Sequence, residues 1–194
     1  DRPEAPESLT GEAIWLARVL VELLPGEEEA LGLLALLLYC EARRPARRGP
    51  DGQYVPLSEQ DPRLWRKEWI LEAEGYLQRA ARRQRPGRFQ LEAAIQSAHS
   101  LRAVTGWVDW PAVTMLYEAL AQRTSTVGAH VGWAAALAET DGPEAGLAIL
   151  AALPADQVAG NQAKWAVRAY LLRRCGSGEA REAYERAAGL TEDP

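Results

Sequence analysis

The sequence contains few of the residues from which enzymes and metal sites are usually built. Its 194 residues include two histidines, two cysteines, one methionine and one phenylalanine. His99 and His130 are far apart in the chain, and neither lies at a metal-ligand spacing. No GxSxG motif, phosphate-binding loop or dinucleotide-binding glycine turn is present. We therefore predict a non-enzymatic protein with no cofactor or metal. A hydrolase using either histidine is an alternative that rests only on their presence.

The chain also lacks a long apolar segment and a cysteine framework. Its longest apolar run, Leu31–Cys40, is far shorter than the roughly 20 residues that a membrane-spanning helix needs. No charged, then apolar, then small-residue leader opens the sequence. Cys40 and Cys175 have no nearby cysteine or histidine, which favours two reduced core thiols over a disulfide or metal pair. We expect a cytoplasmic protein that does not bind a membrane.

Strand patterns are missing as well, and helix-forming residues dominate. No window alternates apolar and polar residues as a half-buried strand does. Ala, Leu, Glu and Arg, which are abundant, are strong helix formers. Apolar residues recur at helical spacing in nine segments, near residues 14–24, 31–42, 64–80, 89–101, 113–120, 131–137, 145–153, 165–172 and 179–190. The sequence therefore predicts an all-α fold.

Helices of this length, joined by short turns, are expected to pack as antiparallel neighbours. The last pair is the most specific. Its residues Trp165, Ala169, Leu172, Gly176, Ala180, Tyr184 and Ala187 follow the tetratricopeptide-repeat (TPR) pattern. Earlier pairs follow this pattern only loosely. We predict antiparallel helical hairpins stacked as a TPR-like superhelix.

The domain boundaries follow from proline, glycine and charge. Asp1–Pro6 is typical of a linker, so we assign residues 1–10 to a linker remnant and residues 11–190 to a single TPR-like helical domain. The break at Thr105–Gly106 offers a subdivision near residues 104–108. The longest interruption is the loop over residues 45–60, and a loop of this length inside a helical domain is usually functional or flexible.

Charge is unevenly distributed along the chain. Residues 41–88 include twelve basic and seven acidic residues, although the whole chain has a net charge of −5. From two clusters we predict a candidate basic surface formed by Arg43, Arg44, Arg47, Arg48, Arg79, Arg82 and Arg83. Both clusters end predicted helices, so stabilisation of the helix dipole is the simpler explanation.

Tryptophan is the most abundant aromatic residue, with seven copies. Trp15, Trp133 and Trp165 fall on apolar stripes, which predicts core positions. Trp65 and Trp69 are four residues apart, so we expect them to lie along one helix face. An exposed tryptophan would instead be an anchor for a partner.

Several short sequence motifs occur along the chain in a specific order and spacing. They are Glu12–Arg18, Leu23–Pro25, Ala30–Leu36, Ala42–Arg47, Asp51–Gly52, Gln60–Trp65, Gln90–His99, Asp109–Trp110 and Asp141–Leu147. Together they resemble the C-terminal, TPR-like extension of bacterial RNA polymerase sigma factors of the extracytoplasmic-function (ECF) type. The similarity covers about Gly11 to Leu190.

The resemblance implies a regulatory, protein-interaction domain that modulates transcription initiation. Its partners would be the sigma core regions, RNA polymerase or another protein, without direct DNA binding by this fragment. The promoter-reading regions would precede Asp1. A stand-alone TPR-like adaptor and a ligand- or peptide-sensing helical domain are the alternatives.

The family's Asp-Gln-Asp-Arg motif before a tryptophan is matched only at Gln60, Asp61 and Trp65. Pro62 replaces the arginine, and Arg63 follows one position later. Asp61 either caps a helix that begins at Pro62 or joins a polar network that holds the loop against the fourth helix. The candidate interaction and loop-anchoring residues are Gln60, Asp61, Arg63, Trp65, Gln90 and His99.

Overall fold

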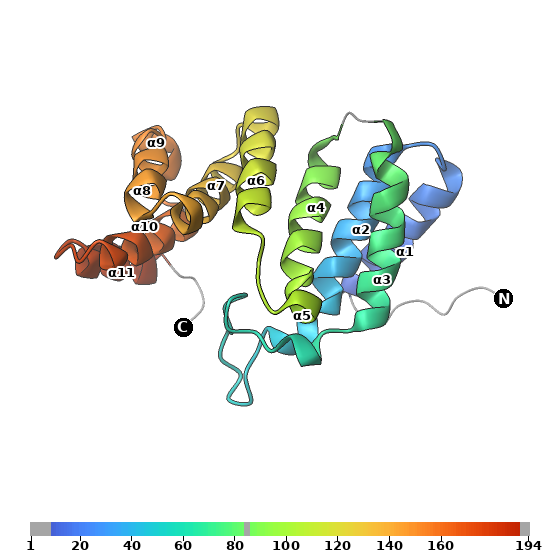
Figure 1. Ribbon diagram of the computed structural model, residues 1–194, viewed down its shortest axis with the longest axis horizontal. Coiled ribbons are helices and arrows are strands. Elements are labelled where there is room, and N and C mark those ends of the chain that lie inside the picture. Colours follow the sequence, from blue (N-terminus) through green and yellow to red (C-terminus); the bar gives the residue numbers. More distant parts are fainter. Residues whose placement is uncertain (1–8, 84–85, 191–194) are drawn as a thin grey trace. The chain divides into compact units, whose positions relative to one another are not determined.

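The structure, a computed structural model, describes residues 9–83 and 86–190, without the side chains of Arg83 and Gln157. The helices of this part are α1 Leu9–Leu23, α2 Glu28–Ala42, α3 Lys67–Ala80, α4 Arg88–Ser100, α5 Arg102–Thr105, α6 Trp110–Thr124, α7 Val127–Thr140, α8 Pro143–Ala151, α9 Ala155–Val158, α10 Gln162–Arg174 and α11 Ala180–Gly189 (Figure 1). Three 3-10 turns complete it, η1 Arg44–Ala46, η2 Pro62–Leu64 and η3 Ala81–Arg83. The described residues contain one isolated β-bridge and no strand, so the all-α prediction is confirmed.

Each of the nine predicted segments corresponds to one of the longer helices, and α5 and α9 are additional four-residue helices. Because α1 begins at Leu9, the prediction that Leu9 and Thr10 belong to a linker was wrong. Residues 1–8 lie outside the described part. The chain divides into two compact units, Asp1–Val108 and Asp109–Pro194, with the boundary next to the predicted seam at residues 104–108.

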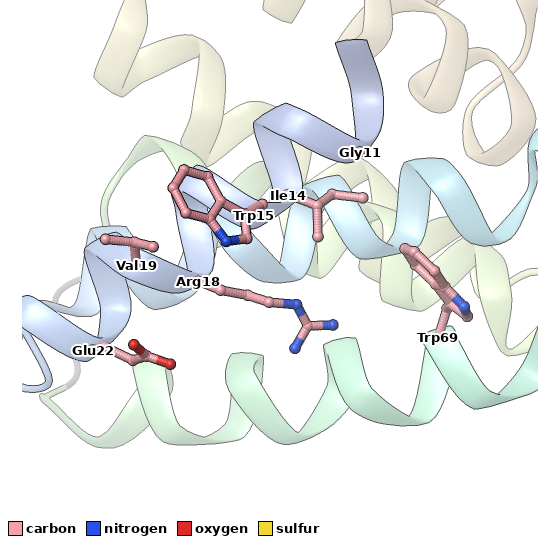
Figure 2. A pocket seen from close by; sticks show the side chains of 7 residues that line it. All are labelled: Gly11, Ile14, Trp15, Arg18, Val19, Glu22 and Trp69. Atoms are coloured by element: carbon pink, nitrogen blue, oxygen red, sulfur yellow. The ribbon is translucent and has the colours of Figure 1, made fainter. Parts of the chain in front are cut away.

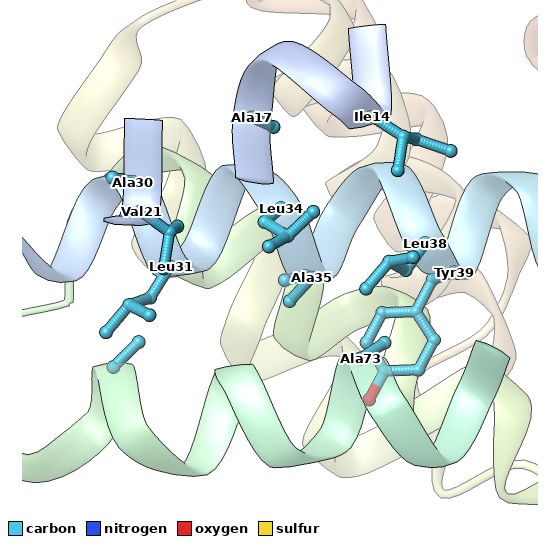
Figure 3. Packing of buried hydrophobic residues seen from close by; sticks show 12 residues of the cluster. Ile14, Ala17, Val21, Ala30, Leu31, Leu34, Ala35, Leu38, Tyr39 and Ala73 are labelled. Atoms are coloured by element: carbon cyan, nitrogen blue, oxygen red, sulfur yellow. The ribbon is translucent and has the colours of Figure 1, made fainter. Parts of the chain in front are cut away.

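The first unit is built around α2. Its side chains Leu31, Leu34, Ala35, Leu38 and Tyr39 lie between α1 and α3 in the core (Figure 3). Tyr39 donates a hydrogen bond from its hydroxyl to Glu74 of α3. As the continuous apolar run indicates, α2 has more buried residues than any other described helix.

The second unit has a core formed by α7, α8 and α10. Val131, Ala134, Ala138, Leu150 and Leu171 are buried there. Ala169 and Leu172 of α10 then pack against Ala183 of α11. Small residues therefore line the places where these helices approach one another, as the TPR-like pattern of the last pair requires. Stacking of all the hairpins into a superhelix remains a prediction.

The start of α4 is capped by a side chain from another helix. Gly87, the residue before α4, has no side chain to cap it. Glu29 of α2 instead accepts hydrogen bonds from the amides of Phe89 at 2.9 Å and Gln90 at 3.2 Å. This carboxylate also faces the positive end of the helix dipole. The cap thus fixes α4 against α2.

Replacing Glu29 with alanine should lower the free energy of unfolding by about 1–2 kcal/mol, as the loss of a helix cap does. Glu29→Gln keeps an acceptor oxygen and should lose less than half of that amount. Glu22→Ala, at an exposed position of α1, is the control. Urea unfolding measures all three; equal effects of Glu29→Ala and Glu22→Ala would contradict the capping role.

Candidate functional site

The segment between α2 and η2 folds into a compact turn, which we call the anchored loop (residues 47–60). The amide of Val55 donates to the carbonyl of Arg47 at 2.9 Å, and the amide of Gly49 donates to the carbonyl of Gln53 at 2.9 Å. The side chain of Tyr54 remains 70% exposed. The loop is therefore an ordered projection with an exposed aromatic residue.

Arg102 of α5 holds the base of the anchored loop. Its guanidinium donates to the carbonyls of Leu57 at 3.0 Å, Ser58 at 2.8 Å and Gln60 at 2.9 Å. The same group lies over the ring of Trp65, 5.4 Å from the ring centroid. Hydrogen bonds from a charged donor are stronger than neutral ones. One side chain thus joins the loop, the segment after it and α5.

Trp65 and Gln60 are both buried beside this anchor. The amide nitrogen Nε2 of Gln60 donates to the carbonyl of Val55 at 3.1 Å. The indole Nε1 of Trp65 and the Oε1 of Gln60 are buried atoms with no hydrogen-bond partner among the described residues. Buried polar atoms normally have a partner, so these two atoms leave hydrogen-bonding capacity at the site.

Charged residues lie at and next to the end of α2. Buried Glu41 forms ion pairs with Arg44 at 3.3 Å and Arg66 at 3.5 Å. Arg43 is also buried and donates to Gln96 of α4. These interactions therefore join α2 to α4 and to the segments on either side of the anchored loop.

His99 lies in the last turn of α4 and is buried. Burial, reinforced by the positive charges of Arg43 and Arg102, lowers the pKa of His99 to about 4. The imidazole is therefore neutral at pH 7.

Asp61 and Arg63 form a local pair on the surface. Asp61 accepts from the backbone amide of Arg63 at 2.9 Å, and its carboxylate lies 2.7 Å from the Arg63 guanidinium. These hydrogen bonds, from the side chain first and then the backbone, lower the pKa of Asp61. The predicted cap at Asp61 is confirmed, but it caps the short turn η2, and α3 begins only at Lys67.

The structure does not bring together all four residues of the predicted polar network, Gln60, Asp61, Gln90 and His99. Gln90 is buried in the first turn of α4 and donates to Glu29 at 3.3 Å, whereas His99 lies at the other end of the same helix. Gln60 and Asp61 bond within their own segment, as described above. Arg102 provides the anchoring instead. No motif in the sequence indicates it, because its partners are backbone carbonyls more than 40 residues away.

The predicted basic surface is not continuous. Arg43 is buried, so its assignment to the surface was wrong. In the first cluster, Arg44 pairs with Glu41, Arg47 donates to the carbonyl of Cys40, and Arg48 donates to the carbonyl of Gly52. In the second cluster, Arg79 stacks on Tyr76 and Arg82 is exposed. The side chain of Arg83 lies outside the described part. Several of these arginines hold the loop or end a helix.

The tryptophans depart from prediction in two respects. Trp15 is 42% exposed, so its assignment to the core was wrong. Trp65 ends η2 whereas Trp69 belongs to α3, so the two do not lie along one helix. Trp133 and Trp165 are half-buried.

Of the two free cysteines, Cys40 is half-buried and Cys175 is exposed, so the prediction of two core thiols was wrong for Cys175.

The described part of each unit contains an open groove. In the first unit a groove of about 590 Å³ runs between α1 and α3, lined by Trp15, Arg18, Trp69 and neighbours (Figure 2). In the second unit a groove of about 460 Å³ is lined mainly by apolar residues together with His130 and Trp133. Both volumes fall in the range of ligand pockets.

Within residues 9–83 and 86–190, no group of three or more His, Cys, Asp or Glu side chains is arranged to hold a metal ion. No helix in the same residues is long and apolar enough to cross a membrane.

Comparison with known proteins adds two matches. A family described as of unknown function, DUF6596, matches residues 2–81, a span that includes α1, α2, the anchored loop and α3. An uncharacterized protein of Rhizobium meliloti (strain 1021) is 37% identical over 183 residues, which are 94% of this chain and 43% of the relative. The chain therefore spans less than half the length of this relative. No solved structure matches the chain.

Proposed function

We propose that this chain is the regulatory, protein-interaction domain of an ECF-type RNA polymerase sigma factor. In this role it modulates transcription initiation from the cytoplasm through contacts with the sigma core regions or RNA polymerase, without catalysis and without direct DNA binding. The ordered sequence motifs that resemble the family's extension support the proposal. That the curated relative is more than twice as long as this chain is consistent with a role as one part of a larger protein.

The structural observation that carries the proposal is the anchored loop. Arg102 fixes the base of the loop, and the loop exposes Tyr54 to a partner. Because the loop is already ordered, binding of a partner costs little conformational entropy. The motif residues Gln60 and Trp65 lie at that base. They set the position of the loop and do not themselves contact the partner.

The test uses the full-length protein that contains this chain, with Arg102→Ala and the control Arg79→Ala. Arg102→Ala removes three hydrogen bonds from a charged donor and should lower stability by about 2 kcal/mol. Trypsin should then cut at Arg47 or Arg48 in the released loop. In vitro transcription should fall at least fivefold at a temperature where circular dichroism shows the variant folded. Arg79 is exposed on α3, so Arg79→Ala should change neither the trypsin cleavage nor the transcription.

Two results would contradict the proposal. One is a coding sequence upstream of Asp1 that contains no sigma regions. The other is a released loop in Arg102→Ala with unchanged transcription and unchanged capture of RNA polymerase.

The groove of the second unit favours the alternative of a ligand- or peptide-sensing helical domain. Its apolar lining includes two aromatic rings, His130 and Trp133, whose centroids are 6.4 Å apart. A stand-alone TPR-like adaptor would use the same kind of groove. Binding of a small apolar ligand that survives Arg102→Ala would favour this alternative.

A further inference from the structure

The first helix, α1, has two apolar faces, of which only one is buried. Ile14, Ala17 and Val21 pack into the core of the first unit. On another face, Leu9 is 83% exposed, Leu16 57% and Leu23 73%. Contiguous exposed apolar surface of this kind marks an interaction site in soluble proteins.

The exposed leucines follow a regular spacing together with half-buried Ala13. We call Leu9, Ala13, Leu16, Leu20 and Leu23 the leucine seam; they are separated by four, three, four and three residues. This is the heptad spacing of a and d positions along which two helices pack with knobs in holes. A helix of 15 residues is about 22 Å long, so the seam accommodates two heptads of a second helix. The occupant that fits is therefore a helix.

One charge beside the seam specifies a flank of that helix. Glu12 is exposed on α1, one turn before Leu16, and forms no ion pair within the part of the chain that the structure describes. Glu22 lies away from the seam and lines the groove between α1 and α3. Arg18, the single cation of α1, points toward α3 (Figure 2) and pairs there with Glu72 at 2.5 Å. The α1 helix of a second copy has no other cation and would therefore offer Glu12 no opposite charge. A basic residue beside the apolar face of a different helix complements Glu12.

We propose that the leucine seam of α1 binds an amphipathic helix of a partner polypeptide. That helix carries leucine-type residues at heptad spacing and lysine or arginine on the flank that faces Glu12. The seam is separate from the anchored loop and from Arg102, so this inference extends the proposed function and does not depend on it.

The binding experiment uses the whole 194-residue chain and synthetic 21-residue peptides followed by fluorescence anisotropy. One peptide has Leu at a and d with Lys at e and g; a second has Glu in place of Lys; a third has the Lys composition with its leucines scrambled. We expect the Lys peptide to bind at least tenfold more tightly than either of the others. Its affinity should fall as salt is raised, because the flanking charges are exposed.

Variants then locate the site on α1. Leu16→Gln with Leu20→Gln should weaken binding of the Lys peptide at least tenfold, and Glu12→Lys should weaken it about threefold. Leu71→Gln is the matched control, because Leu71 is an exposed leucine of α3 outside the seam. It should bind the peptide within twofold of the unchanged protein. These substitutions are at exposed positions, so circular dichroism should show all variants folded.

Three outcomes would overturn the proposal. Equal binding of the scrambled peptide would mean that charge alone attracts it, and equal binding of the Glu peptide would remove the charge argument. A dimer in light scattering that Leu16→Gln with Leu20→Gln dissociates would identify a second copy as the occupant. Changes at Arg102 should leave peptide binding unaltered, which separates this test from that of the loop.

Discussion

Replacing Gly146 with alanine should unfold the second unit more readily, by about 2 kcal/mol, as overpacking of a close contact does. A Cβ atom at Gly146 would lie 2.5 Å from the carbonyl oxygen of Ala134 and 2.8 Å from Cδ1 of Leu171. The first of these atoms belongs to the backbone of α7, so no change of side-chain rotamer can relieve the clash. The helices α7 and α8 would therefore have to separate, and the core formed with α10 would loosen.

Gly75 in α3 provides a matched control for the same chemical change. It also lies in the interior of a helix, and a Cβ added there meets no atom within 4 Å. Gly75→Ala should therefore stabilise the first unit by about 0.5–1 kcal/mol, the difference in helix propensity. Hydrogen exchange read by mass spectrometry should show faster exchange in α7 and α8 for Gly146→Ala. Equal gains from both substitutions would mean that the two helices are not in close contact.

Acid should destabilise the first unit through His99. The imidazole is held neutral in the folded chain with a pKa of about 4, because it is buried and lies near Arg43 and Arg102. In the unfolded chain it binds a proton near pH 6.5. The stability due to the neutral form is complete above pH 6.5 and is lost as the pH falls toward 4. At pH 5 the loss amounts to about 2 kcal/mol.

Urea unfolding at pH 7 and pH 5 measures this effect. At pH 7 the His99→Gln variant should have a lower free energy of unfolding than the unchanged chain. Between pH 7 and pH 5, however, its free energy of unfolding should fall by about 2 kcal/mol less than that of the unchanged chain. His130→Gln removes a half-buried histidine of the other unit and should retain the acid sensitivity of the unchanged chain. An identical loss in the unchanged chain and in His99→Gln would show that His99 is accessible to protons in the folded state.

Local rules predicted most helices because the signals for them are local. Asp109, Thr126 and Asn161 each accept a hydrogen bond from the amide three residues later at a helix start. Asp, Thr and Asn are residue types that favour this position, and capping depends only on neighbouring residues. Asp61 shows the limit of such rules: the cap is there, but the helix it starts lasts for one 3-10 turn.

The candidate site could be predicted only in part. The loop over residues 45–60 and the contact of Gln60 with that loop could be predicted, because the interruption and the motif are visible in the sequence. The partners of these residues were not. Arg102 binds carbonyl groups, which every residue carries, so no residue type or spacing marks its targets.

The sequence by itself determined an all-α chain, the approximate positions of its nine longer helices, and the position of its long loop. Helix propensity, capping and 3.6-residue periodicity act within a few residues, so they can be recognised from the sequence without knowledge of the fold. Only the tertiary structure decided which face of α1 is left uncovered, that Arg43 is buried, and that Arg102 anchors the loop. Those features depend on which helices become neighbours, and packing across 40 or more residues leaves no local signal.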